Sequence, residues 1–248
     1  MNNDNKTYLV DFHILDEEEV KNNFYEWIKS RKNTPINFLE ELKLTSILPY
    51  YMPSYVCDFK IYLDYNVKVQ KKHGLNRAVS TLINGKNNFK ASDYAMFASK
   101  VIPRYDMEQI APFDFSKLSI DGYEKLKTKK EPFSQSYDDC LNHYRGAILS
   151  NLENVVNKSL LKDNSKDMKK KFHNINSHEI TKTSLYKVLL PVWVCKYSYN
   201  NNTYYCLING QNGNAYGHTP IKKSILPIIL IIIFILIITS VIVFKFIL

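Results

Sequence analysis

The side chains in this sequence that could do chemistry are a few acids, histidines and cysteines. An enzyme would have to be built from Asp58, Asp64, His73 and the thiols of Cys57 and Cys195. Both cysteines lie on the apolar positions of alternating segments, where a thiol is usually buried and inert. Because no nucleophile stands beside a base, the sequence predicts no catalytic residue and no bound cofactor, and it favours a protein that is not an enzyme.

The histidines and cysteines could also hold a metal ion, but their spacing does not fit one. No two of the four cysteines have the two-residue separation of a zinc ribbon. His173 and His178 are five positions apart, which is wrong for one helix face, and no nearby cysteine or paired acid completes a ligand set. We therefore predict no metal site. A cross-strand disulfide between Cys195 and Cys206 is geometrically conceivable, and the sequence leaves it open.

The elements that would position these groups are two segments that resemble each other. Each predicts a β-hairpin, so we expect an internal pseudo-repeat near residues 48–85 and 186–217. In the second unit Pro191, Trp193, Asn209, Gly210 and Gly213 are expected to have structural roles. The matching residues are Pro191, Trp193, Val194, Cys195 and Tyr197 with Pro53, Tyr55, Val56, Cys57 and Phe59, followed by Leu207–Gly210 with Leu82–Gly85.

Helical periodicity completes the predicted fold. Asp16 can cap a helix whose apolar positions recur from Val20 to Ile28, and Ser136 with Asp139 opens a longer helix. The lysine-rich residues 161–177 are expected to form an exposed connection. The predicted class is α+β: an antiparallel sheet built from two related hairpin units, with packed helices, in one domain over residues 1–222.

The C-terminal residues have a different character. Residues 225–244 carry no charge and are overwhelmingly apolar, which predicts one transmembrane helix over residues 225–247. Lys222 and Lys223 precede it, so the positive-inside rule places the N-terminal domain in the cytoplasm. The expectation is a tail-anchored, single-pass protein of the cell membrane, with the lipid bilayer as a partner of its last helix.

Several segments, taken in order, resemble one family. They are residues 16–38, 49–59 and 101–119, a long helix, and residues 189–220, which include the Leu-Pro-Val-Trp strand and the Asn-Gly-Gln-Asn-Gly turn. The chain resembles the membrane-anchored zinc-ribbon (TFIIB-type zinc-finger-like) proteins of low-GC Gram-positive bacteria, a family of uncharacterised role. The N-terminal cysteine ribbons of that family are absent from this sequence, so no metal ligands carry over.

Three functions remain open at this stage. The first is a membrane-tethered interaction or scaffold protein with an unidentified protein partner, for which Tyr50 and Tyr62 are the candidate interaction surface. The second is a nucleic-acid-binding protein held at the membrane, which the formal net charge of +9 and the resemblance to zinc-ribbon proteins suggest. The third is an enzyme built from the acids and thiols named first. No pattern in the sequence predicts the oligomeric state.

Overall fold

The computed structural model describes residues 6–73, 77–120, 128–165 and 168–222, together with 231, 234 and 235. Within these residues one sheet contains eight strands, and its main path runs in the order β3-β2-β6-β1-β4. The elements are β1 (Thr7–Val10), α1 (Glu17–Lys29), α2 (Phe38–Glu41), β2 (Lys43–His73), β3 (Arg77–Phe97), α3 (Arg104–Gln109), β4 (Leu118–Ile120), β5 (Lys129–Lys130), α4 (Tyr137–Lys162), β6 (Met168–Tyr199), β7 (Asn202–Asn209) and β8 (Ala215–Gly217).

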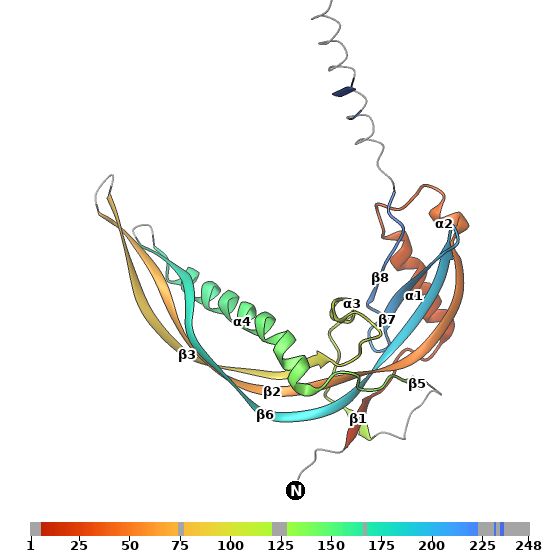
Figure 1. Ribbon diagram of the computed structural model, residues 1–248, viewed down its shortest axis with the longest axis horizontal. Coiled ribbons are helices and arrows are strands. Elements are labelled where there is room, and N and C mark those ends of the chain that lie inside the picture. The colour runs from red at the N-terminus through yellow and green to blue at the C-terminus, as the bar shows by residue number, and fades with distance from the viewer. Residues whose placement is uncertain are drawn as a thin grey trace, which may run out of the picture.

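Three very long strands form the frame of the molecule. β2 pairs antiparallel with β3 on one side and with β6 on the other, and the three strands bend together into a deep arc (Figure 1). Along β2 the odd residues Leu63, Tyr65 and Val67 are buried, while the even residues between them are less buried. This alternation places one apolar face on the inside of the arc.

Helix α4 covers that apolar face and lies along the concave side of the sheet (Figure 1). Ser136 caps it: the hydroxyl accepts from the Asp139 N–H, and the Asp139 carboxylate bonds back to the Ser136 backbone, which completes a capping box. Its buried residues recur every four positions and join the larger of two cores. They are Cys140, Tyr144, Ile148, Leu152 and Val156.

The smaller core lies at the other end of the arc, where α1 packs against β6 and β7. Phe24 of α1 contacts Tyr197 with ring centroids 5.3 Å apart. Phe12 lies between Tyr51 and Trp193, with centroid distances of 5.3 and 5.7 Å. Edge-on aromatic contacts of this kind add to the stabilisation that burial alone provides.

The predicted fold class is wrong about the sheet, which is mixed rather than antiparallel. β1 runs parallel to β6, and β5 runs parallel to β2. The alternating pattern identifies strands, but it does not encode the direction of short segments that are joined to their partners by long connections. β1 has only four residues, and its direction is set by tertiary packing.

The two segments of the predicted pseudo-repeat lie on neighbouring strands, but they are paired differently. In the second unit Ile208 pairs with Trp193. In the first unit Ile83 pairs with Val67, whereas Tyr55, the counterpart of Trp193, pairs with Met96. Gly85 therefore lies within β3 rather than in a turn, and a Cβ atom there would stand 2.7 Å from the Tyr65 ring.

Among the described residues, none of the helices has both the length and the apolar character needed to cross a bilayer. This finding contradicts the predicted transmembrane helix over residues 225–247, and with it the tail-anchored, single-pass placement in the cell membrane and the cytoplasmic side assigned to the domain. Apart from Ile231, Phe234 and Ile235, the residues of that predicted helix lie outside the described part of the chain.

Gly146 offers a direct test of how α4 is stabilised. It is exposed in the helix interior, and a Cβ atom there would meet nothing within 4 Å. We expect Gly146→Ala to raise the free energy of unfolding by about 0.5–1 kcal/mol, because alanine loses less backbone entropy in a helix. Urea denaturation would measure the gain. Gly213→Ala is the matched contrast: Gly213 has a φ of 76°, so it should lose stability, and a loss in both variants would contradict the argument.

Candidate functional site

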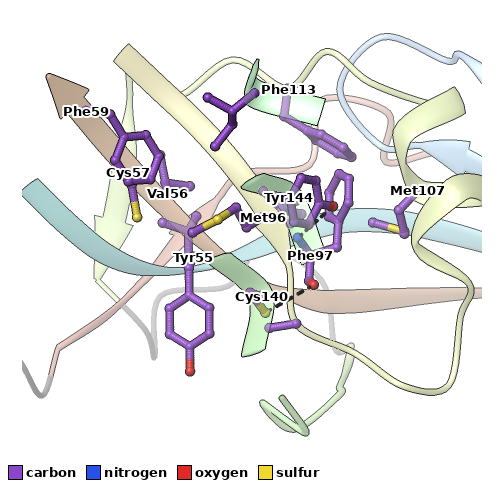
Figure 2. Close-up of a cluster of buried hydrophobic side chains, with 14 of the residues drawn as sticks. Tyr55, Val56, Cys57, Phe59, Met96, Phe97, Met107, Phe113, Cys140 and Tyr144 are labelled. Atoms are coloured by element: carbon purple, nitrogen blue, oxygen red, sulfur yellow. Dashed lines mark hydrogen bonds between the residues drawn. The ribbon is translucent and has the colours of Figure 1, made fainter. Parts of the chain in front are cut away.

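An open cleft lies on the concave side between α4, the end of β3 and the segment that follows α3. It has a volume of about 580 Å³. Aromatic rings form much of its wall, and Phe97, Phe113 and Tyr144 lie close together in Figure 2. Acidic residues stand around them. The lining residues are Ser92, Asp93, Tyr94, Ala95, Phe97, Glu108, Ala111, Pro112, Phe113, Asp114, Phe115, Ser116, Tyr144, Ala147 and Asn151.

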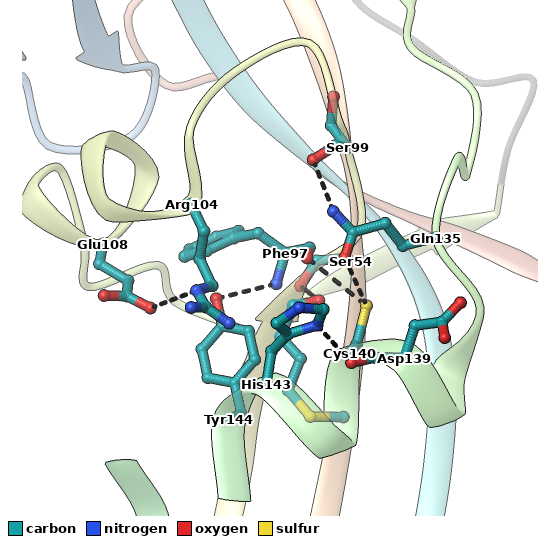
Figure 3. Close-up of polar contacts among 11 residues, drawn as sticks. Ser54, Phe97, Ser99, Arg104, Glu108, Gln135, Asp139, Cys140, His143 and Tyr144 are labelled. Atoms are coloured by element: carbon teal, nitrogen blue, oxygen red, sulfur yellow. Dashed lines mark hydrogen bonds and ion pairs between the residues drawn. The ribbon is translucent and has the colours of Figure 1, made fainter. Parts of the chain in front are cut away.

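Tyr144 joins the helix to the sheet in the wall of this cleft. Its hydroxyl accepts a hydrogen bond from the Phe97 N–H at 3.2 Å, and its ring meets Tyr94 edge-on with centroids 6.0 Å apart. The Arg104 guanidinium lies 4.7 Å from the centre of the Tyr144 ring, and its Nε is 3.7 Å from a Glu108 oxygen (Figure 3). Burial raises the pKa of Tyr144 far above its usual range, so the phenol stays neutral.

The end of β3 is held by side chains that bond to its backbone. Ser54 donates to the Met96 carbonyl at 3.1 Å, and Gln135 donates to the Ser99 carbonyl at 3.3 Å. The Cys140 thiol points at the Phe97 carbonyl with 3.6 Å between sulfur and oxygen (Figure 3). Burial raises the pKa of this thiol to about 11, so it serves as a packed, weakly polar group rather than a nucleophile.

The opposite wall, formed by residues 110–114, is bonded to Asn209, an asparagine that is completely buried. The Asn209 amide nitrogen donates to the carbonyls of Ile110 and Pro112 at 2.9 and 3.0 Å. Its amide oxygen accepts from the Gln211 N–H at 2.9 Å. Asn209 therefore uses both ends of its amide to join the turn after β7 to a loop about a hundred positions earlier in the chain.

Three further amides in the same turn extend this contact. Gln211 accepts from the Asp114 N–H at 2.8 Å and donates to the Asp114 carbonyl at 3.2 Å. Asn212 donates to the Pro112 carbonyl at 2.9 Å, and Asn214 donates to the Ala111 carbonyl at 3.0 Å. We call Asn209, Gln211, Asn212 and Asn214 the amide clamp. It holds the backbone of the cleft wall by hydrogen bonds, in addition to the packing of Ile110 and Phe113 in the larger core.

Both glycines of this turn are needed, Gly210 because its Cα lies close to a neighbouring ring and Gly213 because its φ is positive. A Cβ atom on Gly210 would stand 2.5 Å from the Phe12 ring, and the Gly210 carbonyl accepts the N–H groups of His13 and Ile14, both at 2.9 Å. Gly213 has a φ of 76°, which side chains disfavour. The sequence marks these residues as structural, but their contacts with the segment after β1, at Phe12 and Ile14, could not be inferred from it.

Among the side chains that the structure describes, those proposed for an enzyme do not form one cluster. Burial raises the pKa of both Cys57 and Cys195 to about 12. Asp64 lies beside Lys86 at 3.6 Å and accepts from Asn176 at 2.9 Å. Along β2 it is roughly 20 Å from Asp58, at about 3.3 Å per residue. The side chain of His73 lies outside the described residues.

Asp58 has a structural task at a bulge in β3. Its carboxylate accepts the Ser184 hydroxyl at 2.7 Å and the Asp93 N–H at 3.0 Å, where Asp93 has a φ of 52°. These bonds lower the pKa of Asp58, with Ser184 contributing most. Because the pKa of Asp58 in the folded protein is below its ordinary value of 3.8, the ionised carboxylate stabilises the fold at pH values above 3.8. This contribution is lost as the pH falls through the pKa of the folded protein.

Ser184→Ala should therefore raise the pKa of Asp58 toward 3.8. A carboxyl ¹³C NMR titration would measure it. Thr183→Ala is the control, because the Thr183 hydroxyl donates to the Asp58 backbone carbonyl and not to its carboxylate. An unchanged pKa in Ser184→Ala would show that the carboxylate does not depend on this bond.

The other residues singled out from the sequence are spread over the sheet. Tyr50 packs against the larger core, whereas Tyr62 lies between Asn88 and Glu179, roughly 40 Å further along β2 at about 3.3 Å per residue. Pro191 pairs with Tyr51. Cys195 and Cys206 stand directly opposite each other on β6 and β7, both buried and both as free thiols. Within the described residues no group of three potential ligands could hold a metal ion.

One polar cluster was not foreseen. Asp106 of α3 is 2% exposed, and its Oδ2 accepts from the Tyr205 hydroxyl and lies 2.9 Å from His218 Nε2. Burial, followed by the bond to Asp106, raises the pKa of Tyr205 above its usual range. The cluster joins α3 to β7 and to the segment after β8. A single aspartate in a short polar helix carries no sequence signal for it.

The described residues form a curved, mixed-sheet α+β domain with one long helix on its concave side. No family model matches the chain, and no solved structure matches it. Over 230 residues it is 23% identical to the "Uncharacterized protein YdjG" of Bacillus subtilis (strain 168), an alignment that covers 85% of this chain. The chain spans 62% of the length of that relative. The resemblance to zinc-ribbon proteins remains a prediction.

Proposed function

We propose that this protein is a non-enzymatic interaction protein that binds an apolar group of a protein partner in the cleft beside α4. The observation that carries the proposal is the construction of the cleft, whose walls are fixed before any ligand arrives. Tyr144 fixes the helix side, and the amide clamp fixes the loop side. A preformed, mostly apolar concavity is the usual form of a binding site, because little ordering entropy is lost on binding.

The polar groups of the cleft are suited to ligand binding rather than to catalysis. Glu108 lies beside Arg104, and Tyr144 is held neutral by burial. Asp114 uses a carboxylate oxygen to accept the Ser116 N–H at 2.8 Å. These groups organise the walls, so we assign recognition to the rings and an orienting role to the carboxylates at the rim.

The expected ligand is an aromatic or branched aliphatic side chain of the partner, with donor groups beside it. Tyr94, Phe97 and Phe113 offer ring faces and edges to an apolar group. Asp93 and Asp114 offer acceptors for N–H groups of the partner's backbone or for a neighbouring cation. An anchor residue in a pocket with a polar rim is the arrangement that dominates affinity in protein interfaces.

Blocking the cleft tests the proposal. Ala147 lines the cleft from an exposed position on α4, so Ala147→Trp should fill the space without disturbing the core. We expect the full chain to bind the neutral dye Nile red, and Ala147→Trp to weaken binding at least tenfold in a fluorescence titration. The control is Asn142→Trp, which places the same ring on an exposed part of α4 away from the cleft. Equal affinity in both variants would overturn the proposal.

A further inference from the structure

The outer, convex side of the arc carries an unusual arrangement of charge. On β2 the even residues that face away from α4 run from Lys60 through Tyr62 to Lys68. In the same rows Lys60 pairs with Lys90 of β3, and Lys68 pairs with Lys171 of β6. Like charges directly opposite each other destabilise a sheet, so a bound anion would be favoured beside two such pairs on one face.

The face that carries these pairs has fewer acids than lysines. Lys169 pairs with Gln70 next to the Lys68–Lys171 row, and these side chains line a hollow of about 470 Å³ together with Phe172 and His173. The acids in these rows are Asp64, which lies beside Lys86, and Glu179, whose register partner is Tyr62. The end of the arc near this hollow therefore presents lysines without acidic partners among the described residues.

The uncharged groups on this face suit an extended strand of nucleotides. Tyr62 is half-buried between Asn88 and Glu179, with the open face of the sheet above it. Asn66, Asn174 and Asn176 form a connected group of amides between Tyr62 and the hollow, with Asn66 and Asn176 linked at 2.8 Å. A sheet face that combines lysines, amides and an aromatic ring binds phosphates, base edges and base faces at once.

We propose that this outer face of β2, β3 and β6 binds single-stranded nucleic acid. The phosphates lie over the Lys60–Lys90 and Lys68–Lys171 pairs and in the lysine-lined hollow, where they relieve the repulsion between the lysines. A base stacks on Tyr62. The surface is separate from the cleft, which opens on the concave side, so this activity does not depend on the function proposed above.

Direct binding of a labelled single-stranded oligonucleotide of about twelve thymidines to the full chain tests the proposal. We expect Lys68→Gln with Lys171→Gln to weaken binding at least tenfold, and to reduce the slope of log K against log salt by about 1.4, or about 0.7 for each phosphate that is no longer neutralised. The matched control is Lys21→Gln with Lys29→Gln on α1, which removes the same charge at the other end of the arc (Figure 1). Equal losses in both pairs would overturn the proposal.

Two further arms separate this proposal from a general affinity for anions. Tyr62→Ala should weaken binding about fivefold or more, whereas Tyr62→Phe should retain it, because the ring and not the hydroxyl stacks. A thermal unfolding midpoint of the double lysine variant at or above that of the parent chain would show that it folds and that the pairs repel. Binding to anionic vesicles or to a polyglutamate peptide, without binding to the oligonucleotide, would assign the surface to another partner and overturn the inference.

Discussion

Asn209→Leu is expected to lower the free energy of unfolding by about 3 kcal/mol or more. The side chain is fully buried and makes three hydrogen bonds, to Ile110, Pro112 and the Gln211 N–H. Leucine has a similar size but cannot replace any of them, and each buried group left without a partner costs about 1–3 kcal/mol. Urea denaturation followed by circular dichroism would measure the loss.

Asn212→Leu is the appropriate comparison for this variant. Asn212 also donates to the Pro112 carbonyl, but it is exposed, so water replaces the lost bond and the cost should stay below about 1 kcal/mol. The cleft itself gives a second measurement: Asn209→Leu should weaken Nile red binding, because the wall of residues 110–114 loses its anchor. A loss of stability no greater than that of Asn212→Leu would show that the amide clamp is not what holds the wall.

Trp193→Ala is expected to lower the free energy of unfolding by about 3–5 kcal/mol, as for the truncation of other large buried aromatics. Trp193 is 4% exposed, contacts the Phe12 ring, and donates from Nε1 to the Ile14 carbonyl at 3.0 Å. The change would leave a cavity in the smaller core and an unpaired carbonyl. Thermal and urea unfolding of the full chain would measure it.

Trp193→Phe divides this loss into its two parts. Phenylalanine keeps most of the buried ring but removes the donor to Ile14, so its cost should be about 1–2 kcal/mol, the value of one buried hydrogen bond. The remainder in Trp193→Ala is then the packing contribution. An unchanged unfolding midpoint in Trp193→Ala would contradict the placement of this ring in the core.

The sequence predicts those parts of the fold that depend on local pattern. The apolar spacing from Val20 to Ile28 and the capping residues Ser136 and Asp139 correspond to α1 and α4. The ends of the long strands could not be predicted in the same way. The lysine-rich residues near 70–76 and 161–177 have the composition of loops, but much of each lies in β2 or β6. They pair with each other at one end of the arc, where the outer face of the strands is exposed and accepts lysines.

The candidate site is harder to predict than the fold. The turn that begins at Asn209 is recognisable because Asn and Gly accept unusual backbone conformations. Its partners are the carbonyls of residues 110–114, and because every residue has a backbone carbonyl, the sequence does not indicate which of them accept hydrogen bonds. The cleft also needs Tyr144, which appears in the sequence only as one more apolar position of a helix. A binding site formed by backbone groups and core residues can be identified only in the folded structure.

The amide clamp also has a consequence for the order in which the chain acquires its shape. β2, β3 and α4 all precede residue 165 and can begin to associate while synthesis continues. The wall of the cleft must wait until Asn214 has left the ribosome, because the amides that hold it come from the last turn of the domain. A nascent chain stalled before that turn would already contain every residue that lines the cleft but would lack the hydrogen bonds that hold residues 110–114.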